Sequence, residues 1–564
     1  MTRRLLSLCL AVCVGVSPVA AKPVAKPVPV ADLVKRVDIP HEQFTLPNGL
    51  RVIVHTDRKA PIVAVSVWYH VGSKDEPAGK TGFAHLFEHL MFNGSEHAPG
   101  DYFEPMQRIG ATDMNGTTWF DRTNYFETVP TGALETALFL ESDRMGWLLG
   151  GLDQTKLDNQ RGVVQNEKRQ GDNQPYGLVE YAQLDALFPD GHPYRHPTIG
   201  SMADLDAASL DDVKAWFRAK YGPNNAVIVL AGDIDVAPAR PLVGKYFGAI
   251  PRGPDVTPAA AEVPTLAAPK AETMKDHVAT TRIYRNWVVP GLTDPELVRL
   301  DIATSVLGGL SSSWLDNIHV KGEKIAVSVS ASVQPFERVS LLEVTADVKP
   351  GVDPARVAAR LDAIIADFLA KGPSADEVQR VATREVAGRI NGIESVGGFG
   401  GKATALAEGA IYAGDAGFYK TQLAQYGAAT PADVLAVARK WMSRPAYALT
   451  VEPGERSAYD EAKAMPPGGS HQPAWFRKPG TTPAVVPAPA PAPAAAPAGI
   501  DRSQLPPVGD IADLDFPTVQ HATLRNGIKV SYVQRTNAPL TKLTVSFDAG
   551  NAADDDFAFR RRAD

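Results

Sequence analysis

The chain has 564 residues, of which 44% are hydrophobic and 21% are charged, so its composition is that of a globular protein with room for about two to four domains. Its formal net charge is −7, and its basic residues are scattered rather than clustered. This charge distribution argues against a nucleic acid or another polyanion as its partner.

Residues 1–21, MTRRLLSLCLAVCVGVSPVAA, have the pattern of a secretory signal peptide. Two arginines precede an apolar run that is too short to span a bilayer, and the expected cleavage follows Ala21. Cys9 and Cys13 are the two cysteines of the chain, and both lie in this segment. The processed protein is therefore expected to lack thiols and a stable membrane span, and to be exported, either to the periplasm or by secretion.

After a leader over residues 22–38, strand and helix patterns predict a first domain over residues 39–250. The stretches LRVIVH and IVAVSVWYHV alternate with the two-residue period of strands, and NNAVIVLAGDID indicates a buried strand. Helices are expected around residues 81–92, 131–149 and 153–171.

A second domain is predicted over residues 270–455, after a proline-rich connection. It again mixes strand patterns, IAVSVSASV and VSLLEVTADV, with amphipathic helix patterns, ARVAARLDAIIADFLAKG and ADVLAVARKWM. Residues 456–516 are then expected to form a linker rich in proline and alanine.

The segment after the linker repeats the opening of the first domain. Thr523 to Gly550 aligns without a gap with Thr45 to Gly72, with identities that include an Asn-Gly turn and an Ala-Pro pair. Residues 517–564 are therefore interpreted as the truncated start of a second repeat.

The stretch GFAHLFEHLMFNG contains His85, Glu88 and His89. On a helix, residues four apart share a face, so the two imidazoles can reach one point with the carboxylate beside them. Neutral imidazoles suit Zn²⁺, and H-x-x-E-H is the inverted form of the commoner H-E-x-x-H zinc motif. The alternative is an ordinary trio on the surface of a half-buried helix.

Several separated motifs occur in the order found in the pitrilysin or insulinase-like family of zinc peptidases. They are HLFEHLMFNGSE, NGTTWFDRTNYFETVP, NQRGVVQNEKRQ, HPYRHPTIGS and YGPNNAVIVLAGDID. The chain resembles this family over residues 39–455 and in the repeat fragment. The resemblance implies an α+β fold in which each of two similar domains is a largely antiparallel sheet with helices packed on one face.

Carried over to this chain, the resemblance implies that His85 and His89 are zinc ligands and that Glu88 is the general base acting on the metal-bound water. It implies Glu167 as the third ligand, with Glu180 as the alternative carboxylate, and one zinc per chain. The expected activity is that of a zinc-dependent endopeptidase acting on peptides or unfolded protein segments.

The family often has a second glutamate where this chain has Gln160, which could hydrogen-bond a ligand or the water. Asn115, with Gly116 and Thr117, falls in a family motif in which an edge strand receives the substrate backbone. A turn asparagine beside a glycine is the alternative for Asn115.

Two other features are interpreted without a catalytic role. Residues 396–403, VGGFGGKA, lack the first glycine and the Ser/Thr of a phosphate-binding loop and are interpreted as a flexible glycine hinge. His192 and His196 are each followed by proline, which favours a loop over a helical pair of metal ligands.

The alternative function is that of a non-catalytic or poorly active family subunit, derived from a truncated gene, that serves as a binding partner. In the family, two halves close around the substrate. A homodimer or a separate second-half subunit is therefore the expected protein partner.

Overall fold

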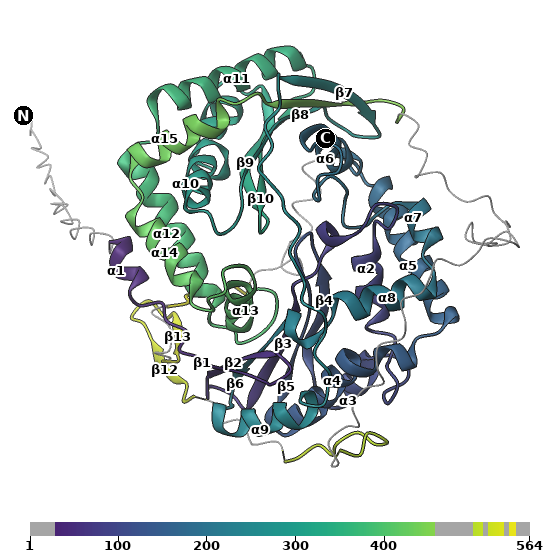
Figure 1. The fold of residues 1–564 in the computed structure, drawn as a ribbon. Helices are drawn as coiled ribbons and strands as arrows, with labels where there is room; N and C mark the ends of the chain where they lie inside the picture. The colour runs from purple at the N-terminus through teal and green to yellow at the C-terminus, as the bar shows by residue number, and fades with distance from the viewer. Residues whose placement is uncertain (1–28, 457–499, 511–516, 535–540, 549–564) are drawn as a thin grey trace, which may run out of the picture.

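The computed structural model describes residues 29–456, 500–510, 517–534 and 541–548 (Figure 1). The expected signal peptide and most of the expected linker lie outside these residues. Among the described helices, none combines the length and apolar character needed to cross a membrane.

The first sheet has six strands in the order β1-β2-β6-β3-β5-β4, and β4 is one of its two edges. Its pairs are antiparallel except for β2 and β6, which run parallel. The strands are β1 (Glu42–Thr45), β2 (Arg51–Thr56), β3 (Ile62–Tyr69), β4 (Thr112–Thr118), β5 (Thr123–Pro130) and β6 (Ala226–Gly232).

Helices of the same half cover one face of this sheet. They are α2 (Phe83–Leu90), α3 (Phe103–Arg108), α4 (Leu134–Gly151), α5 (Gln154–Asn173), α7 (Met202–Ala207), α8 (Leu210–Lys220) and α9 (Val236–Phe247). Helix α6 (Val179–Leu187) also belongs to this half but packs against the second sheet. In α2, Leu86, Phe87 and Leu90 recur at helical spacing and are buried against strand residues such as Val67. The opposite, polar side of α2 is therefore not part of this core.

The second sheet has five strands in the order β7-β11-β8-β10-β9, with β7 and β11 parallel. Its strands are β7 (Lys270–Asp276), β8 (Arg282–Pro290), β9 (Ala326–Pro335), β10 (Val339–Val348) and β11 (Tyr447–Pro453). The helices of this half are α10 (Pro295–Thr304), α11 (Pro354–Lys371), α12 (Ala375–Gly392), α13 (Lys402–Tyr412), α14 (Phe418–Ala428) and α15 (Pro431–Met442). The predicted α+β class, with two layered and largely antiparallel units, is confirmed.

The two halves of the chain pack against each other through a common hydrophobic core. The helices of the first half leave one face of the first sheet uncovered, and helix α13 of the second half packs on that face (Figure 1). There Leu406 and Ala407 join Ala64 and Trp68 in one buried cluster. Strand β3 is therefore covered on both faces, by helices from both halves of the chain.

A buried ionic cluster also joins the halves. Lys74 Nζ lies 3.0 Å from Asp121 Oδ1 in the first half and 3.0 Å from Glu337 Oε2, which follows β9 in the second half. His70 Nε2 lies 2.7 Å from the same oxygen of Glu337, and the backbone N–H of Glu337 donates to Asp121 Oδ2 at 2.8 Å. The Lys74 ammonium is thus paired with a carboxylate from each half of the chain.

The repeat found in the sequence is also a structural repeat. Strands β12 (Gln520–Thr523) and β13 (Lys529–Tyr532) pair antiparallel, with Gln520 opposite Tyr532, as Glu42 is opposite Val54 in the first hairpin. The residues of this second hairpin are exposed or only partly buried.

Candidate active site

The helix that carries the histidine motif is fixed at its start. Gly82 precedes α2 with φ +91°, a backbone conformation that favours glycine. The buried Glu76 carboxylate accepts hydrogen bonds from the N–H groups of Gly82 and Ala84 at 2.9 and 2.7 Å. The N–H groups at the start of a helix have no hydrogen-bond acceptors within the helix, and the Glu76 carboxylate supplies them here.

His196 holds this carboxylate in turn, with its Nε2 atom 3.0 Å from Glu76 Oε2 and 2.9 Å from the Ser73 carbonyl oxygen. Burial raises the pKa of Glu76. Burial alone would lower the pKa of His196, but its hydrogen bond to Glu76, the Glu76 charge and the Ser73 carbonyl together raise it. His196 therefore helps to fix the start of α2 through Glu76. It lies in a loop, as the neighbouring prolines predicted. His192 is bonded to the Glu262 carbonyl oxygen instead.

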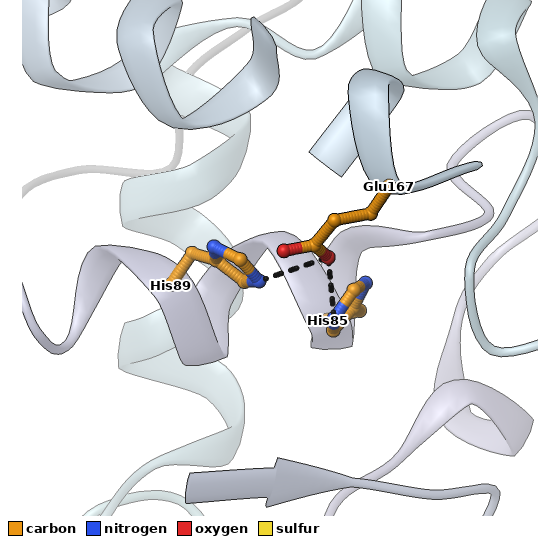
Figure 2. Close-up of side chains that lie close together, drawn as sticks. All are labelled: His85, His89 and Glu167. Carbon is orange, nitrogen blue, oxygen red and sulfur yellow. Dashed lines mark ion pairs between the residues drawn. The ribbon is translucent and has the colours of Figure 1, made fainter. Parts of the chain in front are cut away.

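His85 and His89 project from the polar side of α2 toward Glu167 on α5, which packs beside it. The Nε2 atoms of His85 and His89 lie 3.6 and 3.4 Å from Glu167 Oε2. Figure 2 shows the Glu167 side chain reaching from its helix toward both imidazole rings. One ligand atom from each of the three residues lies within 4.8 Å of the others.

The donor set fits a zinc ion. Burial, together with the nearby charge of His89, lowers the pKa of His85 to about 3, so this imidazole is neutral and keeps its lone pair for a metal. Two imidazole nitrogens and one carboxylate oxygen are the three-ligand pattern of catalytic zinc sites, which leave a fourth position open. Among the described residues, no other group of three such side chains converges in this way. Glu180, the alternative carboxylate, lies in the first turn of α6 and is not part of the group.

Gln160 supports the ring of His89. Its Oε1 atom lies 3.3 Å from His89 Nδ1, and its Nε2 atom donates to Asn93 Oδ1 at 3.1 Å. Asn93 closes the network by donating to the His89 carbonyl oxygen at 2.9 Å. With Nδ1 held by an acceptor, the proton of a neutral ring stays on that nitrogen and Nε2 is left free.

Glu88 lies one turn after His85, next to the edge strand β4. Burial raises the pKa of Glu88, against the lowering effects of a hydrogen bond from Thr118 and the charges of His89 and Arg122. Thr118 is the last residue of β4. The carboxylate therefore faces the end of a strand whose outer edge is unpaired among the described residues.

The residues predicted to receive a substrate lie along this edge. Asn115 is exposed, and its side-chain oxygen accepts from the Gly116 N–H at 2.8 Å. A Cβ on Gly116 would lie 2.8 Å from the Phe92 ring, so close packing requires glycine there. The guanidinium of Arg122, which the sequence did not single out, donates to the Thr117 carbonyl oxygen at 3.0 Å.

Comparison with known families agrees with this fold. Residues 51–197 match the family model described as insulinase (peptidase family M16), and residues 207–384 match the model described as the peptidase M16 inactive domain. The chain belongs to this family, which is the pitrilysin or insulinase-like family that the sequence motifs indicated.

Individual relatives cover most of the two units. The chain is 29% identical over 365 residues to the zinc protease PqqE of Helicobacter pylori, covering 63% of this chain and 80% of that protein. The crystal structure of a protease from Helicobacter pylori matches with a TM-score of 0.67 and 24% identity, covering 73% of this chain and 99% of the other. The first half of the periplasmic protease PqqL from Escherichia coli matches with a TM-score of 0.61 and 18% identity, covering 74% of this chain and 92% of the other. Since curated relatives are named zinc proteases, peptidase activity and zinc use are supported at the level of the family.

Proposed function

We propose that this chain is a zinc-dependent endopeptidase that hydrolyses peptides or unfolded protein segments. The observation that carries the proposal is the convergence of His85, His89 and Glu167, with Glu88 on the same helix as the histidines. Two imidazole nitrogens and one carboxylate oxygen, brought together from two helices, are the ligand set of a catalytic zinc site.

His85, His89 and Glu167 would hold one Zn²⁺ per chain. When bound there, the ion would act as a Lewis acid that polarises the scissile carbonyl and makes a water molecule acidic enough to attack it. Gln160 would keep the His89 ring in the orientation that presents Nε2.

Glu88 is assigned the proton transfers. As general base its carboxylate takes a proton from the attacking water, and it then passes that proton to the leaving amine. Burial raises the pKa of Glu88, which makes its carboxylate a stronger base for the first of these transfers.

The edge strand β4 is assigned to substrate binding. An extended peptide would add to its unpaired edge, with Asn115, Gly116 and Thr117 beside the reacting bond. The Gly116 N–H, which now donates to the Asn115 side chain, would be offered to the substrate.

The family membership also supports assignments of domains, localisation and a protein partner. We propose that residues 39–250 form the catalytic domain, that residues 270–455 form a second domain of the family, and that the protein is exported to the periplasm. The likeness to the first half of PqqL supports a second copy or a separate second-half subunit as the protein partner.

The test is a set of matched variants of the full exported chain. Zinc content and cleavage of an internally quenched peptide are measured with and without a chelator. Wild type is expected to bind zinc and cleave, His85→Ala to do neither, and Glu88→Gln to bind zinc without cleaving. Glu104→Gln, in an exposed ion pair on α3, is the control and should behave as wild type. If wild type binds zinc but cleaves no peptide, the non-catalytic subunit is the better account.

A further inference from the structure

The glycine-rich loop of residues 395–401 belongs to the second half but lies on the first sheet. The Phe399 ring packs edge-on against the Phe126 ring of β5, with centroids 5.0 Å apart and an interplanar angle of 76°. A Cβ on Gly397 would lie 2.4 Å from Thr128 Oγ1 and 2.9 Å from Ala64 Cβ. Gly397 therefore permits a close approach between the halves, which the hinge interpretation did not anticipate.

The loop is held at both ends by its own backbone and by an ion pair. The N–H groups of Lys402 and Ala403 donate to the Ser395 and Val396 carbonyl oxygens, each at 3.0 Å. The Lys402 ammonium forms a buried ion pair with Asp57 of the first half. These contacts fix the loop on the sheet, yet the Phe399 side chain at its tip stays 65% exposed.

Phe399 lies beside the edge strand that the proposed function assigns to substrate. Phe126, its aromatic partner, pairs with Asn115 of β4. A Cβ on the neighbouring Gly398 would lie 3.9 Å from the Asp113 carboxylate carbon. Asp113 has φ 53° and sits where the β4–β5 register shifts, so the edge strand is irregular just where the loop meets it.

The alternation of side chains along a strand decides which face is involved. Tyr125 belongs to the core on the side of α2, so its neighbour Phe126 points to the opposite face. A peptide added to the edge of β4 would send every second side chain to that face. Glu88 is near Thr118, and Asn115 and Asp113 lie about three to five residues further along the strand, or roughly 10–17 Å at about 3.3 Å per residue.

We propose that Phe399, with Phe126 behind it, forms a subsite that binds an apolar side chain of the substrate about three to five residues from the cut bond. This inference rests on the proposed function, because it needs the peptide to lie along β4. It makes Phe399 a specificity-determining residue supplied by the second half to the active site of the first. It gives the second half a direct part in substrate selection.

The test uses two fluorescent peptides that differ at one position, a phenylalanine or an alanine, scanned over the third to fifth positions on each side of the cleavage site. Binding is measured by anisotropy with the full chain carrying Glu88→Gln, so the readout needs no turnover. At one of these positions, Phe399→Ala should weaken binding of the phenylalanine peptide about tenfold and leave the alanine peptide unchanged. Phe399→Leu should restore most of the loss. Val327→Ala, at a 50% exposed apolar residue of β9, is the control and should change neither.

Two results would overturn the subsite: equal effects of Phe399→Ala on both peptides at every position, or no effect on either. Because Phe399 is exposed, thermal unfolding of the variant should match that of wild type, which separates lost contact from lost fold. The proposed function has a separate test. If Phe399-dependent binding of the phenylalanine peptide is observed but the wild-type chain, with Glu88 intact, cleaves neither peptide, the proposed function is wrong and the subsite stands.

Discussion

Replacing Glu337 by glutamine tests how the two halves are joined. Burial alone would raise the pKa of Glu337, but its hydrogen bonds and charge interactions with His70 and Lys74 lower it to about 2 from an ordinary 4.5. A depression of that size corresponds to roughly 3 kcal/mol of stability, and its side chain is only 5% exposed, so solvent screens it little. We expect Glu337→Gln to lose about 2 kcal/mol near neutral pH, because the amide oxygen still accepts one hydrogen bond.

The assay is urea unfolding of wild type and Glu337→Gln over a series of pH values. A carboxylate whose pKa is lowered in the folded state stabilises that state above its unfolded pKa, and this stabilisation is lost as the pH falls toward the folded pKa. The difference between the two proteins should therefore be constant above about pH 5, and should shrink between about pH 4.5 and pH 2. Glu104→Gln, at an exposed ion pair, should change stability by less than about 0.5 kcal/mol. A difference for Glu337→Gln that is absent at neutral pH, or that grows as the pH falls, would refute this reasoning.

Three further predictions concern the metal site. Glu167→Ala should lose zinc on dialysis while Glu180→Ala keeps it, as elemental analysis would show; equal retention would mean that the wrong carboxylate was chosen. Gln160→Ala should weaken zinc binding about 10- to 100-fold in competition with a chromogenic chelator, because His89 loses its support, and unchanged affinity would remove that role. A chelator should lower the thermal unfolding temperature of wild type but not of His85→Ala, since a ligand bound only to the folded state stabilises it. A shift of equal size in both proteins would point to a different metal site.

Local patterns in the sequence predicted much of the fold. The alternating run at β3 predicted a strand, and the helical spacing in α2 predicted a helix with one apolar side. The family motif led from the His-x-x-Glu-His helix to Glu167, which the structure brings to the histidines across many residues of intervening chain.

What the sequence could not indicate are contacts between distant segments that have no motif. The salt bridge between Glu76 and His196 fixes the start of α2, but nothing in either segment marks the other as its partner. The burial of β3 on both faces depends on α13, which belongs to the other half. The glycines around Phe399 were interpreted as a hinge because sequence alone does not distinguish freedom of the backbone from close approach to a neighbour.

The central claim is that Glu88 performs proton transfer beside a zinc ion held by its neighbours. The most direct measurement is the zinc content and the peptide-cleavage rate of Glu88→Gln and wild type, purified side by side. The account predicts equal zinc in the two proteins and a rate at least 100-fold lower in the variant, in line with the roughly 10²- to 10⁴-fold contribution of general acid–base catalysis. A Glu88→Gln protein that binds zinc and cleaves at the wild-type rate would contradict it.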